Sequence, residues 1–383
     1  MKQLSLLNSD LGMIIMFILV LLLGILLMHY VVIIWTCLNT PRLPYNAWTR
    51  VLPLILSLLF VGLMFSTRVS HGVFADILTP VLYIWLGSLF LWFTLVMATM
   101  AVQMTLIIFK IQPAFKLGPF ILAAAAVISI ISVINAARTP DVKIIEIKNS
   151  KITAPISIAQ VTDTHLGDGV SAARLQKMFD RLAAHKPDLI VFTGDIFERR
   201  GRETQKFIDI IKAQNPRCGK YGVAGNHEFY SGLERSLQLW HESGITPLLN
   251  ESADICGINV VGVNDIKAAR VSRREFERVI NESDTSKFTL LLSHTPLYHE
   301  EAAQDGVDLM LSGHTHNGQI WPFNKLVRLQ FRHVYGMHEH GGLMHYVSSG
   351  AFYWGPPMRF LTKNEVPVFT IKPSPAVIAS ETK

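Results

Sequence analysis

Charged residues are scarce in this 383-residue chain. They make up 17% of it, whereas hydrophobic residues make up 50%. Soluble domains usually contain about 25% charged residues, so the composition excludes an ordinary soluble protein of two domains. The formal net charge of +6 is also modest and does not indicate a nucleic-acid-binding surface. We therefore expect a membrane protein that does not bind nucleic acid.

Cysteine is also rare, with only Cys37, Cys218 and Cys256. Their spacing matches no metal-ligand pattern and excludes a zinc ribbon. A Cys218–Cys256 disulfide would fit a domain that lies outside the cytoplasm. Free buried thiols are the outcome that we expect.

The apolar residues are concentrated before residue 140. Four apolar runs predict four transmembrane helices, at about residues 11–38, 51–65, 78–109 and 117–137. The first run is too long for the core of a signal peptide. His29 and Gln103 lie within these runs and are functional candidates by default, although we expect them to face neighbouring helices or a head-group region. The predicted domains are a transmembrane domain, residues 1–140, and a second domain, residues 141–383.

Basic residues in the loops favour one orientation weakly. Four spans place both ends of the chain on the same side of the bilayer, and the two tight loops on the other side contain Arg42, Arg50, Lys110 and Lys116. Loops rich in Lys and Arg tend to remain in the cytoplasm. We therefore expect the second domain to be extracytoplasmic.

In the second domain, buried strand-like runs alternate with helical patterns and predict an α/β fold. Polar residues follow five of these runs directly. The five segments are Asp163-Thr-His165, Gly194-Asp195, Gly225-Asn226-His227-Glu228, Ser293-His294 and Gly313-His314-Thr-His316. Each alone has a simple explanation as a helix cap or a turn. Because sites in open α/β sheets form at the carboxyl ends of strands, the five together predict a metal site. Carboxylate, imidazole and amide donors suit Mn, Fe or Zn.

These segments resemble the calcineurin-like metallophosphoesterase superfamily over about residues 142–372. The similarity is strongest to a branch with membrane-anchored or exported bacterial phosphoesterases and a vertebrate transmembrane relative. It extends to Gly318–Asn324, Tyr346–Gly350 and Pro356–Arg359. The resemblance implies a four-layer α/β/β/α sandwich after the four transmembrane helices. It also implies a multi-pass protein of a bacterial inner membrane.

The resemblance further implies two divalent metal ions, which would be Mn, Zn or Fe. Asp163, His165 and His316 would bind the first ion, Asn226, His294 and His314 the second, and Asp195 would bridge them. A hydroxide between the ions would attack phosphorus. His227 would contact a phosphoryl oxygen or protonate the leaving group.

Two further segments carry open interpretations. Arg199, Arg200 and Arg202 would lie at the rim of the metal site, where they would bind a diphosphate or an anionic head group. A solvated basic loop is the alternative. The segment Met337–His345 predicts a hairpin that turns at Gly341-Gly342, and we expect its histidines at the surface and outside the metal site.

We expect a membrane-bound phosphoesterase that hydrolyses phosphodiester or diphosphate bonds in a lipid or lipid-linked substrate, because its tether would keep the site close to the bilayer. One alternative is an exported phosphoesterase of broad specificity, acting on wall polymers or soluble esters. The other is a membrane sensor or scaffold with a metal-binding domain.

Overall fold

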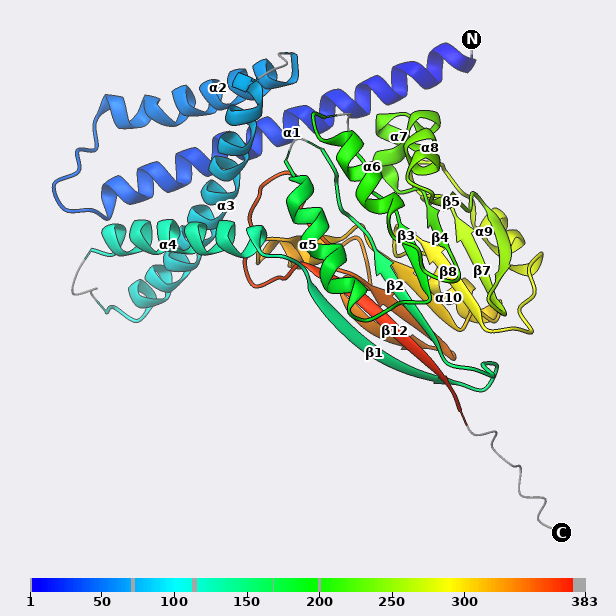
Figure 1. Cartoon of the computed structure of the whole chain (residues 1–383). Helices are drawn as coiled ribbons and strands as arrows, with labels where there is room; N and C mark the ends of the chain where they lie inside the picture. Colours follow the sequence, from blue (N-terminus) through cyan, green and yellow to red (C-terminus); the bar gives the residue numbers. More distant parts are fainter. Residues whose placement is uncertain (1, 70–72, 112–115, 168, 199–200, 375–383) are drawn as a thin grey trace. The chain divides into compact units, whose positions relative to one another are not determined.

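The computed structural model describes residues 2–69, 73–111, 116–167, 169–198 and 201–374 (Figure 1). The chain divides into two compact units. The first contains Met1–Ile134 and Pro356–Met358, and the second contains Asn135–Gly355 and Arg359–Lys383.

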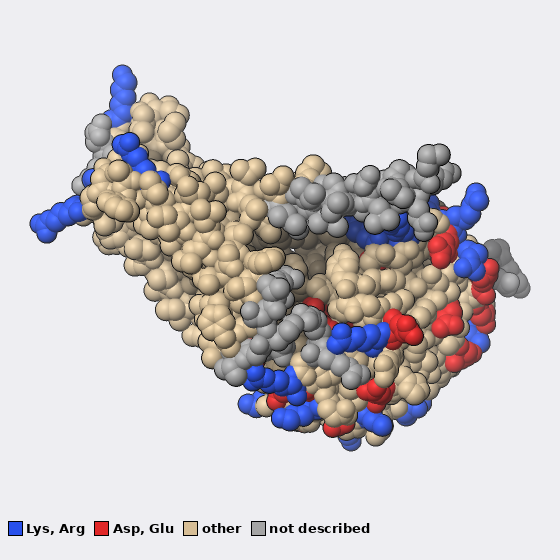
Figure 2. Space-filling model, turned by 90° about the horizontal axis from the view of Figure 1, so that it is seen from above, with Lys and Arg blue, Asp and Glu red and all other residues tan. Residues whose placement is uncertain are grey.

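The first unit is built from long apolar helices. They are α1 (Lys2–Leu38), α2 (Ala47–Val69), α3 (Val73–Ile108) and α4 (Gly118–Ala137). All four are long and apolar enough to cross a membrane. Figure 2 shows that much of their surface is free of charged side chains, with Lys and Arg near one end. The four predicted spans are thus found as helices.

The polar side chains within these helices contact other helices, as expected. His29 Nδ1 lies 3.0 Å from Ser57 Oγ, and Trp85 donates a hydrogen bond to His29 Nε2 (3.2 Å). Trp35 donates a hydrogen bond to Gln103 Oε1 (3.1 Å). Both side chains therefore have partners inside the helical unit, as buried polar groups require.

The second unit contains two six-stranded sheets. In spatial order, the first sheet consists of β1 (Asp141–Asn149), β12 (Glu365–Pro373), β2 (Ile156–Val161), β3 (Leu189–Thr193), β4 (Lys220–Val223) and β5 (Thr246–Pro247). The second consists of β10 (Gly336–His340), β11 (Leu343–Val347), β9 (Leu309–Ser312), β8 (Thr289–Ser293), β7 (Ile258–Val263) and β6 (Glu251–Ile255).

Helices cover the outer face of each sheet. Those packed on the first sheet are α5 (Ala172–Ala183), α6 (Thr204–Lys212) and α8 (Leu233–Glu242), and those on the second are α9 (Arg273–Asn281) and α10 (His299–Gln304). The inner faces share a core that includes Ile158, Val191, Leu290, Leu309 and Phe369. This arrangement confirms the predicted four-layer α/β/β/α sandwich.

Parallel pairing brings the polar strand ends together. Strands β2, β3 and β4 are parallel neighbours, as are β7, β8 and β9. Strands β3, β8 and β9 are buried along their whole length, which explains their continuous apolar runs. Their carboxyl ends point to the same edge of the sandwich, where ligands can converge.

Cys218 and Cys256 form a disulfide, with their Cα atoms 5.9 Å apart. The expectation of free thiols was therefore wrong. Cys218 precedes β4 in one sheet, and Cys256 lies in the turn between β6 and β7 of the other. The bond joins the two sheets, and this proximity arises only when they stack.

The hairpin predicted over Met337–His345 is confirmed as β10 and β11. Gly341 and Gly342 form its turn with φ values of 55° and 90°, which glycine adopts without strain. The expected surface position was wrong for His345, which is fully buried. Because β11 pairs with β9 as well as β10, it is an inner strand of the sheet rather than half of an isolated hairpin.

Candidate metal centre

The seven predicted metal ligands lie together at the carboxyl edge of both sheets. Asp163 and His165 follow β2, Asp195 follows β3, and Asn226 begins the short helix α7 (Asn226–Ser231) after β4. His294 follows β8. His314 and His316 follow β9, and His316 begins the short 3-10 helix η1 (His316–Gly318).

Five of these residues have an uncommon backbone conformation. Asp163, His165, Asp195, His314 and His316 have φ values between 42° and 67°. Residues other than glycine rarely adopt positive φ, and such strain is concentrated at functional sites. Here the positive φ values turn the side chains of these five residues toward one centre.

Two glycines permit this convergence by their lack of a side chain. A Cβ atom on Gly225 would collide with the carboxylate of Asp195, and one on Gly313 would collide with the carboxylate of Asp163. The backbone therefore approaches both carboxylates more closely than any other residue type allows.

The first half of the site consists of Asp163, His165 and His316. One donor atom from each lies within 4.8 Å of the others. His165 Nε2 lies 3.1 Å from His316 Nε2, and His316 Nε2 lies 3.3 Å from Asp163 Oδ1.

The second half consists of Asn226, His294 and His314. Asn226 Oδ1 lies 2.9 Å from His314 Nδ1 and 3.2 Å from His294 Nε2. Asp195 Oδ2 reaches both halves, at 3.1 Å from His294 Nε2 and 3.9 Å from His165 Nε2. The arrangement thus has two groups of donors with one carboxylate between them.

The chemistry of these donors fits divalent cations. Asp163 is fully buried, and burial raises the pKa of its carboxyl group above the ordinary value. Burial lowers the pKa of His314 to about 4 and that of His316 well below its ordinary value. At His294, burial opposes the charged form but the carboxylate of Asp195 outweighs burial, so that the pKa of His294 is raised. Metal ligation requires neutral imidazoles, and a cation would compensate the buried negative charge.

Glu198 links two histidines of the site and was not predicted. Its Oε1 atom lies 2.6 Å from His165 Nδ1 and 2.8 Å from His227 Nδ1. Burial opposes a charge on His227, but the hydrogen bond to Glu198 and the nearby carboxylates of Asp195 and Glu228 raise its pKa above the ordinary value. Glu198 therefore fixes the orientation of His165 and favours a protonated His227.

Glu228 is fully buried and holds the loops of the site together. Its carboxylate accepts hydrogen bonds from the backbone N–H groups of Asp195, Ile196 and Gly225, each at 2.8 Å. Glu228 thereby positions the backbone on both sides of Asp195.

Arg359 has a similar structural role on the other side of the site. It is fully buried and donates hydrogen bonds to the carbonyl oxygens of Ser349 (2.6 Å) and Lys363 (3.0 Å). Its Nη2 atom also lies 3.4 Å from His316 Nδ1. The resemblance included Pro356–Arg359 but did not assign this contact.

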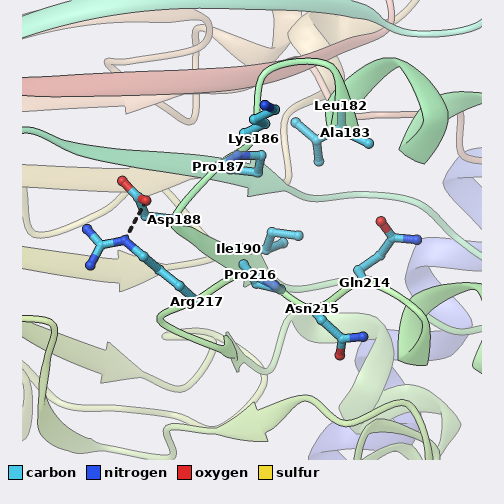
Figure 3. A pocket seen from close by; sticks show the side chains of 10 residues that line it. All are labelled: Leu182, Ala183, Lys186, Pro187, Asp188, Ile190, Gln214, Asn215, Pro216 and Arg217. Carbon is cyan, nitrogen blue, oxygen red and sulfur yellow. Dashed lines mark hydrogen bonds and ion pairs between the residues drawn. The ribbon is translucent and has the colours of Figure 1, made fainter.

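The predicted substrate-binding arginines lie partly outside the described residues. This applies to Arg199 and Arg200, whereas Arg202 is described and exposed. A separate surface pocket includes Asp188 and Arg217, which form an ion pair of 2.6 Å (Figure 3). Asp188 precedes β3, so this pocket lies at the opposite end of the strand from the metal ligands.

Sequence comparison identifies relatives of the second unit. Residues 156–318 match the calcineurin-like phosphoesterase family. The chain is 31% identical over 245 residues to an uncharacterized metallophosphoesterase of Campylobacter jejuni, covering 63% of this chain and 66% of the relative. It is 29% identical over 279 residues to a transmembrane protein with metallophosphoesterase domain of Danio rerio, covering 68% and 63%.

A metallophosphoesterase of Aquifex aeolicus is 35% identical over 223 residues, covering 57% of this chain and 85% of the relative. The chain thus spans somewhat less than two thirds of the Campylobacter and Danio proteins, but most of the Aquifex protein. The range matched by the family, residues 156–318, contains the positions of all seven converging residues. The chain belongs to the calcineurin-like phosphoesterase family.

Proposed function

We propose that the protein is a membrane-bound phosphoesterase that hydrolyses a phosphodiester or diphosphate bond in a lipid or lipid-linked substrate. Asp163, His165 and His316 would bind one divalent ion, and Asn226, His294 and His314 a second, with Asp195 contacting both. Bound ions would supply Lewis acidity toward water and the phosphoryl oxygens. The side chains of the protein would hold the metal-binding atoms in position and would supply a proton to the leaving group.

His227 is the proposed proton donor. Its side chain is 14% exposed and contacts Glu198, so it can reach a substrate while remaining oriented. When water adds to phosphorus and the ester P–O bond breaks, His227 would transfer its proton to the leaving oxygen. Its raised pKa supports this role, because a larger fraction of the imidazole is protonated near neutral pH.

An exposed apolar rim beside His227 carries the lipid assignment. The ring of Trp354 lies 5.8 Å from that of His227, and 54% of Trp354 is exposed. Gln319 exchanges two hydrogen bonds with the backbone of Trp354, each 3.0 Å long. Since Gln319 follows η1 directly, the rim is fixed to the segment that carries His314 and His316.

Further exposed apolar side chains lie on and just after the short helix α11 (Phe323–Val327), which has no buried residue. Leu326 and Leu329 are 54% and 84% exposed. Exposed Lys325 directly precedes Leu326, and exposed Arg328 directly precedes Leu329. Apolar and basic residues together are typical of surfaces that bind anionic lipid.

The disulfide supports an extracytoplasmic second domain. Disulfides persist in oxidising compartments, and Cys218 and Cys256 form one. This agrees with the weak orientation signal of the loops. The basic side chains of Arg199, Arg200 and Arg202 remain proposed as contacts for a phosphate-containing head group.

The test is to replace Phe323, Leu326 and Leu329 together by Ser and to measure hydrolysis of two substrates. With a phosphodiester lipid in anionic vesicles, we expect kcat/KM to fall by about 10-fold or more, because burial of one such side chain contributes roughly 1.5–3 kcal/mol. With a small aryl phosphodiester, kcat/KM should not change.

The matched control is Ile144→Ser, which changes an exposed apolar residue of β1 and should affect neither substrate. Equal losses on both substrates in the triple variant, or no loss on either, would contradict the lipid assignment. Incubation of the Mn-loaded protein with a membrane lipid extract, followed by mass spectrometry, would then identify the lipid that is consumed.

A further inference from the structure

A second group of histidines lies apart from the predicted metal ligands. It contains His299, the first residue of α10, and His333, in the segment before β10. His338 lies on β10 and His345 on β11. One ring nitrogen each from His299, His333 and His345 lie within 4.8 Å of one another.

The rings are packed closely. His333 Nδ1 lies 2.9 Å from His345 Nδ1. The ring centroids of His299 and His333 are 4.1 Å apart, and those of His333 and His338 are 4.0 Å apart with nearly parallel planes. Side chains from three different segments thus aim nitrogen atoms at one point.

Hydrogen bonds among the described residues do not satisfy every ring nitrogen of this group. Both ring nitrogens of His299 are buried and have no hydrogen-bond partner among the described residues. A neutral imidazole has one donor and one acceptor, and a buried polar atom without a partner destabilises the folded state. The part of the chain that the structure describes therefore leaves these nitrogens available to a ligand.

The donor set of this group suits a transition-metal cation. Burial and the neighbouring histidines lower the pKa of His333 to about 3, and they lower that of His345 well below its ordinary value. Neutral imidazoles without a carboxylate in the set suit Zn²⁺, Cu²⁺ or Ni²⁺ and do not suit Mg²⁺ or Ca²⁺.

The second ring nitrogen of His345 has a partner that would orient the imidazole for metal binding. Its Nε2 atom lies 3.1 Å from Ser312 Oγ, while Nδ1 faces His333. A ligating histidine typically uses its second nitrogen in this way, which fixes the direction of the first.

We infer that His299, His333 and His345 form a binding site for one transition-metal ion, with Zn²⁺ as the best match. The ion would join α10, the segment before β10 and the inner strand β11. Water would complete the coordination.

This site would stabilise the segment that carries two of the predicted catalytic ligands. Ser312, which contacts His345, lies two residues before His314. Thr315, between His314 and His316, donates a hydrogen bond to the carbonyl oxygen of Val334 (2.6 Å), next to His333. The ion would therefore hold both ends of the segment 312–334 in place.

The experiment counts metal ions in the purified full-length protein. The wild type and a His299→Gln variant are stripped with a chelator, loaded with Zn²⁺ alone and freed of excess ion, and zinc is then measured by mass spectrometry. We expect His299→Gln to bind one equivalent less than the wild type. His299 is only partly buried and begins a helix, so this variant should fold. The zinc content of a His345→Gln variant, which changes the fully buried member of the group, is measured in the same way and should also be one equivalent lower.

The matched control is His241→Gln, an exposed histidine of α8, which should retain the wild-type content. The comparison is repeated in an Asp195→Ala background, in which the proposed catalytic ions are impaired. Loss of one equivalent on adding His299→Gln there would support the second site independently of the proposed function. Equal zinc contents with and without His299→Gln in both backgrounds would overturn it.

Discussion

Glu198 connects the proposed metal ligand His165 with the proposed proton donor His227, because one of its carboxylate oxygens contacts both. In a Glu198→Gln variant, we expect kcat to fall by about 10- to 100-fold, the usual effect of losing a partner of a metal-binding histidine. The pKa of His227 should also fall, since Glu198 raises it. His227 would act in its protonated form, so the alkaline limb of the pH–rate profile should move to lower pH.

The pH profile separates this role from a merely structural one. Glu282→Gln is the control. Glu282 is exposed, directly follows α9 and forms an ion pair with Arg278 of that helix. Its profile should match the wild type. A Glu198→Gln enzyme with an unshifted alkaline limb would rule out His227 as the group that Glu198 tunes.

Arg359 is the second residue whose role can be measured directly. Replacement by Met would remove the donor that fully buried Arg359 provides to the buried carbonyl oxygen of Ser349 and to the carbonyl oxygen of Lys363. We expect the free energy of unfolding to fall by about 3 kcal/mol. Urea denaturation of the full-length protein in detergent, followed by tryptophan fluorescence, gives this value.

Arg278→Met is the comparison for Arg359→Met. Arg278 is exposed and forms a surface ion pair, which typically contributes about 0–1 kcal/mol. Similar losses in the two variants would show that the buried hydrogen bonds of Arg359 contribute little.

At the scale of secondary-structure elements, the disulfide connects parts of both sheets, since Cys218 precedes β4 and Cys256 lies between β6 and β7. The two cysteines are 38 residues apart in sequence. Restricting a loop of this length in the unfolded chain stabilises the folded state by about 4 kcal/mol. Replacing both cysteines by Ala should therefore lower the midpoint of thermal unfolding.

Cys37→Ala provides the control, because Cys37 is the free cysteine of the chain. Its thermal midpoint should remain at the wild-type value. If a reducing agent lowered the wild-type and the Cys218→Ala/Cys256→Ala midpoints equally, the bond would not contribute to stability.

Local patterns predicted the elements whose signals are contiguous in sequence. Strands β2, β3, β8 and β9 were found because each is a buried apolar run followed directly by ligand residues. Strand β12 was not predicted, since its place between β1 and β2 depends on pairing with residues more than 200 positions earlier. Glu198 was missed for the same reason, because its contact with His227 requires two separate strand ends to meet.

For the histidines near the hairpin, the local pattern was misleading. The turn at Gly341-Gly342 was correctly predicted, but a hairpin alone suggests one exposed face. Pairing of β11 with β9 buries His345, and the path of the chain brings His299 and His333 beside it. Neither contact has a signal in the spacing of these residues.

At the scale of the whole molecule, the chain combines four long apolar helices with clusters of His and Asp side chains that could hold metal ions. The orientation of the second domain can be measured with a thiol-reactive, membrane-impermeant label. A cysteine placed at Tyr230, a residue 73% exposed beside the site, should react in intact cells if this domain is extracytoplasmic. Reaction only after cell lysis would place it in the cytoplasm.

The central claim is that seven side chains from both sheets form one metal-dependent hydrolytic site. The most direct measurement compares metal content and aryl phosphodiester hydrolysis in wild-type protein and an Asp195→Ala variant, because Asp195 contacts both halves of the site. We expect the variant to lose two equivalents of metal and all detectable hydrolysis. Wild-type metal content together with retained hydrolysis would contradict the account.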